Sequence, residues 1–176
     1  MRIISGWLKG RRLNPPKNLP VRPTTDLSKE ALFNILNNTL EYESCDALDL
    51  FAGTGNISLE LASRGCKSIL SVDKNILCCK YIIETSKLLN IETIKVVKSD
   101  VFFYLKNSTE SFDFIFADPP YDLDKVIELP SMILNSNFLK PDGIFVIEHK
   151  TNVNLGFSDR LTDYRKYGQS AFSFFQ

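Results

Sequence analysis

The hydrophobic positions along the chain follow two different periods. Short apolar runs at 46–51, 68–73, 94–98, 112–117 and 143–148 are typical of buried strands. Between them, apolar residues recur at helical spacing near 56–64, 75–89, 101–106 and 123–135, and Gly65 and Asn90 stand where helix C-caps are expected. This alternation predicts an α/β, Rossmann-like fold around a doubly wound, mostly parallel sheet with helices on both faces.

The two ends of the chain carry other patterns. Residues 1–13 alternate and turn near 6–10, which predicts a β-hairpin. The proline-rich stretch 14–23 indicates an extended connector, and a helix capped by Thr25 or Asp26 is expected to run to about Asn38. The closing "YRKYGQSAFSFFQ" predicts two strands around Gly168. We expect one domain, 1–176, with the hairpin and connector in 1–25 and the Rossmann-like core in 26–176.

Composition limits the possible partners. The 21 basic and 21 acidic residues cancel, so contact with nucleic acid requires a local basic patch. No apolar run is long enough to span a bilayer, and the N-terminus lacks the apolar core of a signal peptide, so we expect a cytoplasmic protein without membrane contact. Four cysteines without a CxxC pair and one histidine predict reduced, packed thiols and no metal site.

A glycine loop follows the first strand, in "ALDLFAGTGNISLE" (47–60). Gly53 and Gly55 allow a sharp turn and a close approach to a ligand, and Asp73 ends the second strand where an acid would accept hydrogen bonds from a ribose. A dinucleotide is disfavoured, because Ser58 replaces the third glycine of its fingerprint and Asp49 would repel a pyrophosphate. Asp49 could instead hold an ammonium group, directly or through water. S-adenosylmethionine carries an ammonium, a sulfonium and no phosphate.

The third strand is followed by Asp100. Its carboxylate could accept a hydrogen bond from an adenine amino group, with Val101 or Phe102 against the ring. The same residue is a good N-cap for the helix expected to begin at Val101, so both interpretations stay open.

The fourth strand ends in Asp118, Pro119, Pro120 and Tyr121. The prolines lack N–H groups, so they stop the ladder and leave carbonyl acceptors. Hydrogen bonds from a planar amino group to Asp118 and the Pro119 carbonyl would direct its lone pair toward a methyl group, while the base stacks on Tyr121. A simple turn is the alternative, because proline pairs do end strands.

Basic residues cluster with an aromatic near the N-terminus. Trp7 stands among Arg2, Lys9, Arg11 and Arg12, and Lys17 and Arg22 continue the cluster. We expect this patch to contact RNA phosphates. The alternative is a solvated edge hairpin whose charges discourage aggregation. We interpret His149 as structural and "RKYG" (165–168) as a charged strand end.

These motifs resemble those of a known family. "DLFAGTG", "SVD" and "DPPY" are similar to the cofactor and catalytic motifs of class I S-adenosylmethionine-dependent amino-methyltransferases. "RIISGWLKGRRL" (2–13), "RPTTDLSKEALFNIL" (22–36) and "YGQSAFSFF" (167–175) resemble the RsmD family of bacterial 16S ribosomal RNA guanine-N2 methyltransferases. The resemblance runs from near Arg2 to near Phe175. It implies a seven-stranded sheet with an antiparallel last strand, S-adenosylmethionine as cofactor, and a guanine of 16S rRNA in the small ribosomal subunit as target.

Carried over by position, the resemblance implies roles for single residues. The cofactor loop would comprise Asp49, Phe51, Gly53 and Gly55, with Asp73 at the ribose, Asp100 and Val101 near the adenine, and Arg22, Pro23 and Thr24 near the methionine end. The catalytic turn that holds the guanine would comprise Asp118, Pro119, Pro120 and Tyr121. A guanine inside a helix cannot reach such a site, so its base must be turned out or already unstacked. We expect a monomer that recognises the shape of a ribonucleoprotein particle.

Other functions remain open at this point. DPPY alone also fits an amino-methyltransferase acting on DNA adenine or protein glutamine. A DNA enzyme is disfavoured, because we expect no added target-recognition domain in these 176 residues. A nicotinamide-dependent dehydrogenase is disfavoured by Ser58 and Asp49. A non-catalytic ribosome-assembly protein that binds RNA is disfavoured by the intact Asp49, Asp73 and DPPY.

Overall fold

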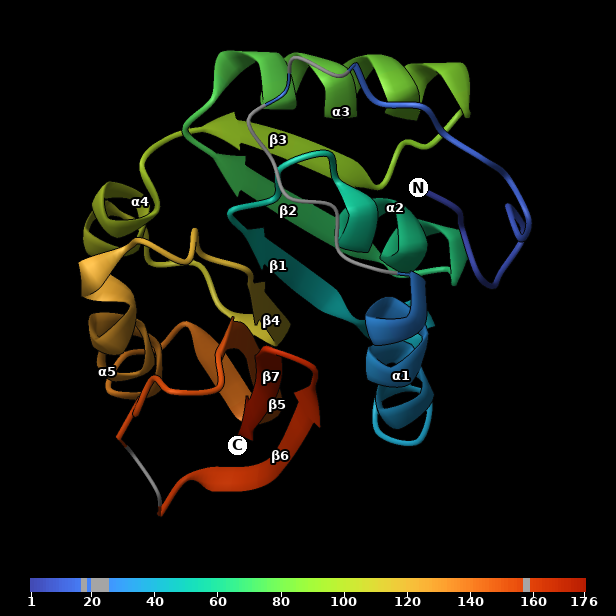
Figure 1. The fold of residues 1–176 in the computed structure, drawn as a ribbon. Coiled ribbons are helices and arrows are strands. Elements are labelled where there is room, and N and C mark those ends of the chain that lie inside the picture. The colour runs from blue at the N-terminus through green and yellow to red at the C-terminus, as the bar shows by residue number, and fades with distance from the viewer. Residues whose placement is uncertain (17–18, 20–25, 157–158) are drawn as a thin grey trace.

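The computed structural model describes residues 1–16, 19, 26–156 and 159–176. Its centre is a seven-stranded sheet in the order β3-β2-β1-β4-β5-β7-β6 (Figure 1). The strands are β1 (Asp46–Leu50), β2 (Ser68–Asp73), β3 (Ile94–Lys98), β4 (Phe112–Ala117), β5 (Leu139–Lys150), β6 (Leu161–Tyr167) and β7 (Ser170–Phe175). Strands β1 to β5 are parallel, and β7 runs antiparallel between β5 and β6. The predicted fold class, with its antiparallel last strand, is confirmed.

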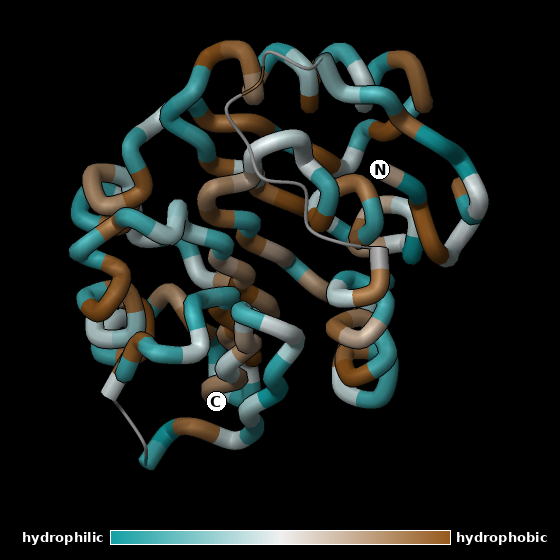
Figure 2. Tube along the Cα trace, in the orientation of Figure 1, coloured by the Kyte–Doolittle hydropathy of each residue, from teal (hydrophilic) through white to brown (hydrophobic). Residues whose placement is uncertain are grey.

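Helices cover both faces of this sheet. They are α1 (Asp26–Leu36), α2 (Asn56–Ser63), α3 (Ile76–Leu88), α4 (Val101–Asn107) and α5 (Leu129–Leu134), with short 3-10 helices η1 (Tyr42–Ser44) and η2 (Asp124–Glu128). Successive residues of a strand point to opposite faces. In β4, Phe114 and Phe116 therefore pack into the core under α1 and α2, whereas Ile115 and Ala117 pack into the core under α4 and α5. Figure 2 shows the hydrophobic residues along the central strands.

Two helix ends follow the sequence pattern closely. Gly65, just beyond α2, has φ 89° and Asn90, just beyond α3, has φ 54°. Left-handed backbone at this position ends a helix, and glycine and asparagine tolerate it best. Both predicted C-caps are confirmed. Of the two residues proposed to cap α1, Thr25 lies outside the described residues, and Asp26 is the first residue of the helix.

The N-terminal loop, residues 1–13, is fastened to α2. A single antiparallel bridge joins Arg2 and Arg12, and the Ile3 N–H donates to the Arg11 carbonyl at 2.9 Å. The two halves of this loop do not form longer strands, because their backbone groups bond to α2 instead of to each other. The Ile4 N–H donates to Glu60 at 2.8 Å, and the N–H groups of Ser5 and Trp7 also donate to residues of α2. The predicted β-hairpin is therefore reduced to a closed loop with one bridge.

The region from 123 to 135 differs from the prediction. The helix expected there is divided into two kinds: the 3-10 helix η2 covers 124–128 and the short α-helix α5 covers 129–134. Pro130 lies in the first turn of α5, where a backbone N–H has no partner within the helix, so its absence costs nothing. In the interior of a longer helix, the lack of this N–H would remove a backbone hydrogen bond. Within the described part of the chain, no helix is long and apolar enough to cross a membrane.

A candidate active site at the carboxyl ends of the parallel strands

A cavity of about 1160 Å³ opens where the parallel strands end. Chain order reverses between β1 and β4, and open α/β sheets bind ligands at such a point. Among the described residues, the cavity brings together nearly all of the predicted cofactor and catalytic positions: Asp49, Phe51, Gly53, Asp73, Asp100, Val101, Asp118, Pro119, Pro120 and Tyr121. Gly55 does not line it, and the predicted Thr24 and Arg22 lie outside the described residues.

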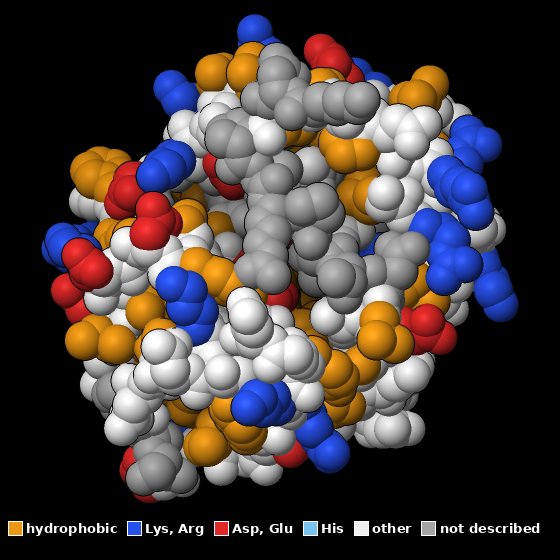
Figure 3. All heavy atoms as spheres, in the orientation of Figure 1, with side chains coloured by type: hydrophobic (Ala, Val, Ile, Leu, Met, Phe, Trp, Pro, Cys, Tyr) orange, Lys and Arg blue, Asp and Glu red, His pale blue; other side chains and the backbone are white. Residues whose placement is uncertain are grey.

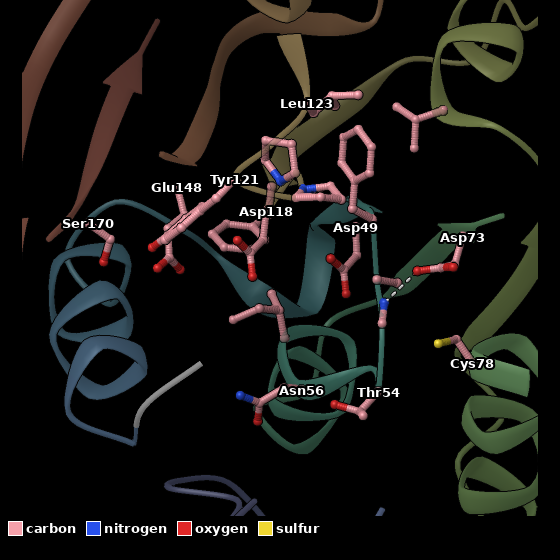
Figure 4. Close-up of a pocket in the computed structure, with 18 of the residues that line it drawn as sticks. Asp49, Thr54, Asn56, Asp73, Cys78, Asp118, Tyr121, Leu123, Glu148 and Ser170 are labelled. Carbon is pink, nitrogen blue, oxygen red and sulfur yellow. Dashed lines mark hydrogen bonds between the residues drawn. The ribbon is translucent and has the colours of Figure 1, made fainter. Parts of the chain in front are cut away.

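The glycine loop owes its shape to backbone that most residues avoid. Phe51 has φ 58° and Gly53 has φ 53°, and the Gly53 N–H donates to Asp73 Oδ2 at 2.8 Å (Figure 4). At Gly55, with φ 71°, an added Cβ would lie 2.9 Å from Ile82 Cγ1 on α3. Gly53 therefore serves the turn beside the cavity, while Gly55 serves the close packing of the loop against α3.

Asp49 is a buried acid in the cavity wall. It is 2% exposed and accepts two hydrogen bonds from Ser58, one from the N–H at 3.1 Å and one from the hydroxyl at 2.5 Å. Burial raises the pKa of Asp49 to about 7; the Ser58 bonds oppose the rise and the Asp73 carboxylate adds to it. Ser58, the residue that breaks the dinucleotide fingerprint, thus orients Asp49, a role that the sequence analysis missed. A cationic ligand group beside Asp49 would favour its ionised form.

Asp73 and Asp100 each bond to backbone and also line the cavity. Besides Gly53, Asp73 accepts the Asn75 N–H at 2.7 Å, so it joins the glycine loop to the end of β2. Asp100 accepts the Phe103 N–H at 3.0 Å and caps α4. The capping interpretation of Asp100 is confirmed, and its place in the cavity wall keeps the ligand interpretation as a proposal. Phe51 and Phe102 meet edge to face, with centroids 6.5 Å apart, on the same wall.

The Asp-Pro-Pro-Tyr turn is held from several sides. The Asp118 N–H donates to the Leu50 carbonyl at 3.3 Å, which ties the turn to β1. The Pro120 carbonyl accepts the Leu123 N–H at 3.0 Å and so belongs to the turn itself. Lys150 Nζ lies 5.5 Å from the centroid of the Tyr121 ring. This bracing fixes Asp118 and Tyr121 on the cavity wall (Figure 4).

Several cavity residues escaped the sequence analysis. Glu148 of β5 lines the cavity, and so do Lys166, Tyr167, Gly168 and Ser170 around the β6–β7 turn. The interpretation of "RKYG" as only a charged strand end was therefore incomplete. Glu148 could have been found by asking which polar residue closes the apolar run of β5, as Asp118 closes that of β4.

His149, which follows Glu148 in β5 and was interpreted as structural, is buried inside the sheet. Its ring nitrogens lie 2.8 Å from the Lys150 carbonyl oxygen and 2.8 Å from Ser173 Oγ. Burial lowers the pKa of His149. These contacts agree with the structural role assigned to it.

The predicted RNA-binding residues that the structure describes lie on the N-terminal loop, whereas Lys17 and Arg22 lie outside the described residues. Trp7 is 62% exposed although its indole N–H donates to the Ala62 carbonyl at 3.3 Å. The exposed basic residues of the loop are Arg2, Lys9, Arg11 and Arg12. Figure 3 shows blue side chains along this edge of the molecule. The loop is joined to the cavity by the buried Lys29, whose Nζ donates to the Arg2 carbonyl at 2.6 Å and to Asn56 Oδ1 at 2.9 Å.

Two further predictions concerned the cysteine thiols and metal binding. All four cysteines are buried and have free thiols. Within the described ranges, no group of three or more histidine, cysteine or acidic side chains could hold a metal ion.

The chain is similar in sequence to known proteins over most of its length. The model of the family described as "Conserved hypothetical protein 95" matches residues 1–176. The "Putative rRNA methyltransferase YlbH" of Bacillus subtilis is 34% identical over 159 residues, which cover 88% of this chain and 85% of that protein. The "Ribosomal RNA small subunit methyltransferase D" of Buchnera aphidicola from Acyrthosiphon pisum is 31% identical over 176 residues, covering 93% of this chain and 85% of that protein.

Solved structures of known proteins also share the fold of this chain. The "Putative methyltransferase yhhF" of Escherichia coli superposes with a TM-score of 0.87 at 26% identity, covering 100% of this chain and 97% of the other. The structure described as "SMU.776, a putative methyltransferase complexed with SAH" shares the fold alone, with a TM-score of 0.68 at 19% identity over 86% of this chain and 50% of the other.

Proposed function

The chain belongs to the Conserved hypothetical protein 95 family, and from that membership and the cavity we propose that it is a cytoplasmic, S-adenosylmethionine-dependent methyltransferase acting on the N2 amino group of a guanine in 16S rRNA of the small ribosomal subunit. The observation that carries the proposal is one cavity that brings Asp49, Asp73 and Asp100 together with the Asp-Pro-Pro-Tyr turn. The names of the relatives support ribosomal RNA as the target class.

The residues of the cavity fit the cofactor. Asp73 offers a carboxylate to the ribose hydroxyls, Asp100 an acceptor to the adenine amino group, and Phe102 an apolar surface to the ring. Buried Asp49 suits the ammonium group of the methionine end. S-adenosylmethionine, when bound, supplies a methyl group whose bond to sulfur breaks with the electron pair remaining on sulfur.

The chain itself orients the target. Asp118 and the Pro119 carbonyl accept hydrogen bonds from the guanine amino group, which directs its lone pair at the methyl carbon. Tyr121 stacks on the base, with Lys150 behind the ring. The nitrogen becomes cationic as it gains its bond to carbon, and Asp118 stabilises that charge and accepts or relays the proton that leaves. Positioning therefore supplies most of the catalysis, and no strong base is required.

The target base must leave its stack to enter the cavity. The exposed basic residues of the N-terminal loop contact the phosphates around it, and these contacts fix the position of the RNA without reading its sequence.

The test uses radiolabelled S-adenosylmethionine and small ribosomal subunits from cells that lack this enzyme. The RNA is digested to nucleosides and the labelled product is identified. We expect labelled N2-methylguanosine. Label in adenosine or in ribosomal protein would contradict the proposed target, and no label together with no cofactor binding by calorimetry would contradict the proposed reaction.

A further inference from the structure

Glu148 stands beside Asp118 at the end of the sheet. Strands β4 and β5 are parallel and pair Phe116 with Val146 and Ala117 with Ile147. The next pair in this register is Asp118 and Glu148. Neighbouring strands lie about 4.8 Å apart, and paired residues of parallel strands point to the same face. Both acids therefore belong to the face of Phe116 and Val146, on which the cavity opens.

The close-up agrees with the register. Figure 4 shows the carboxyl groups of Glu148 and Asp118 directed into the same cavity, near Tyr121. Glu148 lies inside β5 and is paired with Phe172 of β7 on its other side, so its backbone is fixed by two neighbouring strands. It is 7% exposed. A carboxylate held this firmly in a cavity wall is suited to recognise a ligand with a hydrogen-bond donor.

The chemistry of the target base supplies such a donor. Guanine carries an N1–H directly beside its N2 amino group, whereas adenine has an acceptor at N1. An ionised carboxylate only accepts hydrogen bonds, so it favours guanine and repels an N1 lone pair. We propose that Glu148 selects guanine by accepting the N1–H while Asp118 and Pro119 hold the neighbouring amino group. This assignment rests on the proposed function and adds the residue that sets its base specificity.

The experiment separates base selection from folding and from cofactor binding. Once the methylated position is mapped, small subunits are reconstituted with guanine or 2-aminopurine at that position. 2-Aminopurine keeps the amino group at C2 but has an acceptor at N1. The enzymes compared are the wild type, Glu148→Gln, Glu148→Asp and, as a control, Glu128→Gln, whose side chain is exposed and outside the cavity.

The expected results follow from the donors and acceptors. The wild type and Glu128→Gln should prefer guanine by about 100-fold or more in kcat/KM. With 2-aminopurine, the N1 acceptor of the base would face the carboxylate of Glu148, which is also an acceptor. Glu148→Gln should lose about 10- to 100-fold on guanine, and its preference should fall below about tenfold, because its amide N–H can donate to the analogue's N1. Glu148→Asp, which keeps the carboxyl group, should retain a preference for guanine. Cofactor affinity and thermal unfolding should stay near the wild-type values.

Two results would overturn the assignment of Glu148 and leave the proposed function intact. One is a wild type that uses both bases equally well, and the other is a Glu148→Gln variant that keeps the full preference for guanine. If Glu148→Gln does not fold, Glu148→Asp decides, since loss of selectivity there would also contradict the assignment. A wild type that forms no N2-methylguanosine on the guanine subunits would overturn both proposals.

Discussion

Asp118 is the residue that we propose to act on the target amino group and not on the cofactor. Its carboxyl lies in the turn after β4, whereas the groups proposed for the cofactor follow β1, β2 and β3. We predict that Asp118→Ala lowers kcat by at least about 100-fold, because the amino group loses its charged acceptor and its orientation. The dissociation constant for S-adenosylmethionine, measured by calorimetry, should change by less than about threefold.

Asp124→Ala is the matched control for this variant, since Asp124 is exposed and outside the cavity wall. It should retain wild-type turnover. An Asp118→Ala variant that loses cofactor affinity as strongly as turnover would show that the acid serves the cofactor side.

The raised pKa of Asp49 makes stability depend on pH. Because its pKa of about 7 in the folded protein lies above the usual value of 3.8, the native state keeps a proton that the unfolded chain releases between these values. The unliganded protein should therefore lose roughly 2–4 kcal/mol of stability between pH 4 and pH 8 through this group. In urea unfolding, Asp49→Asn should remove that loss, while Asp124→Asn should behave as the wild type.

The same titration predicts the pH dependence of cofactor binding. An ammonium group binds the ionised form of Asp49, so affinity for S-adenosylmethionine should rise as pH increases through about 7. Asp49→Asn should bind more weakly and lose this slope. A wild-type affinity that is constant between pH 6 and pH 8 would contradict the assignment of Asp49 to the ammonium group.

At the scale of elements, a buried ion pair joins the N-terminal loop to two helices. Lys29 of α1 and Glu60 of α2 are fully buried, with Nζ and Oε2 3.2 Å apart. Glu60 also accepts N–H groups from Ile4 and Ser5 of the loop and pairs with Arg64. The pair therefore holds the basic loop at a fixed place beside the cavity.

Removing Lys29 should release that loop and leave a buried acid undercompensated. We predict that Lys29→Met lowers the free energy of unfolding by about 3–5 kcal/mol. Lys67→Met is the matched control, because Lys67 pairs with Asp46 at 3.2 Å but is 57% exposed, and it should cost less than about 1 kcal/mol. If both variants lost the same free energy of unfolding in urea, burial would not determine how much the Lys29–Glu60 pair contributes to stability.

The basic residues of the N-terminal loop should contribute to the binding of small subunits. Replacing Lys9, Arg11 and Arg12 together by alanine should weaken binding of small subunits and lower the slope of log affinity against log salt by about 1 for each charge removed. The control replaces the exposed lysines 80, 87 and 95 of α3 and β3. If both triple variants lose affinity equally, the RNA contact is not specific to the loop.

How far the sequence predicts these elements depends on how local their causes are. The strands, the helix ends at Gly65 and Asn90, the glycine loop and the Asp-Pro-Pro-Tyr turn follow from residues within a few positions of one another. Other contacts join distant segments. They are the hydrogen bonds of Ser58 with Asp49 and with Ser71 of β2, whose hydroxyl oxygens lie 2.7 Å apart, the Lys29–Glu60 pair, and the alignment of Glu148 with Asp118. Only the register of strands and helices creates these contacts. A short sequence pattern can mark Glu148 as a polar residue at the end of β5, but it does not predict which residue lies beside it.

At the scale of the whole molecule, the order of the strands separates the proposed cofactor half of the cavity from the target half. Strands β3, β2 and β1 lie on one side of the reversal and β4 and β5 on the other. The proposed methyl donor and acceptor therefore approach one another at the boundary between β1 and β4, where the Asp118 N–H bonds to the Leu50 carbonyl. A small shift of either half would disturb the line between sulfur, methyl carbon and nitrogen.

The balance of charges over the molecule determines what kind of RNA it can select. With 21 basic and 21 acidic residues, the protein has little general attraction for RNA. The described part of the predicted basic patch lies on the small N-terminal loop. Such a surface can recognise a particular arrangement of phosphates better than it can bind a long flexible strand. We predict that the wild type methylates assembled small subunits with a kcat/KM at least about tenfold higher than protein-free 16S RNA, which corresponds to about 1.4 kcal/mol of added recognition. Single-turnover methylation of both substrates at one salt concentration measures the difference, and equal rates on the two would show that the folded RNA alone presents the target.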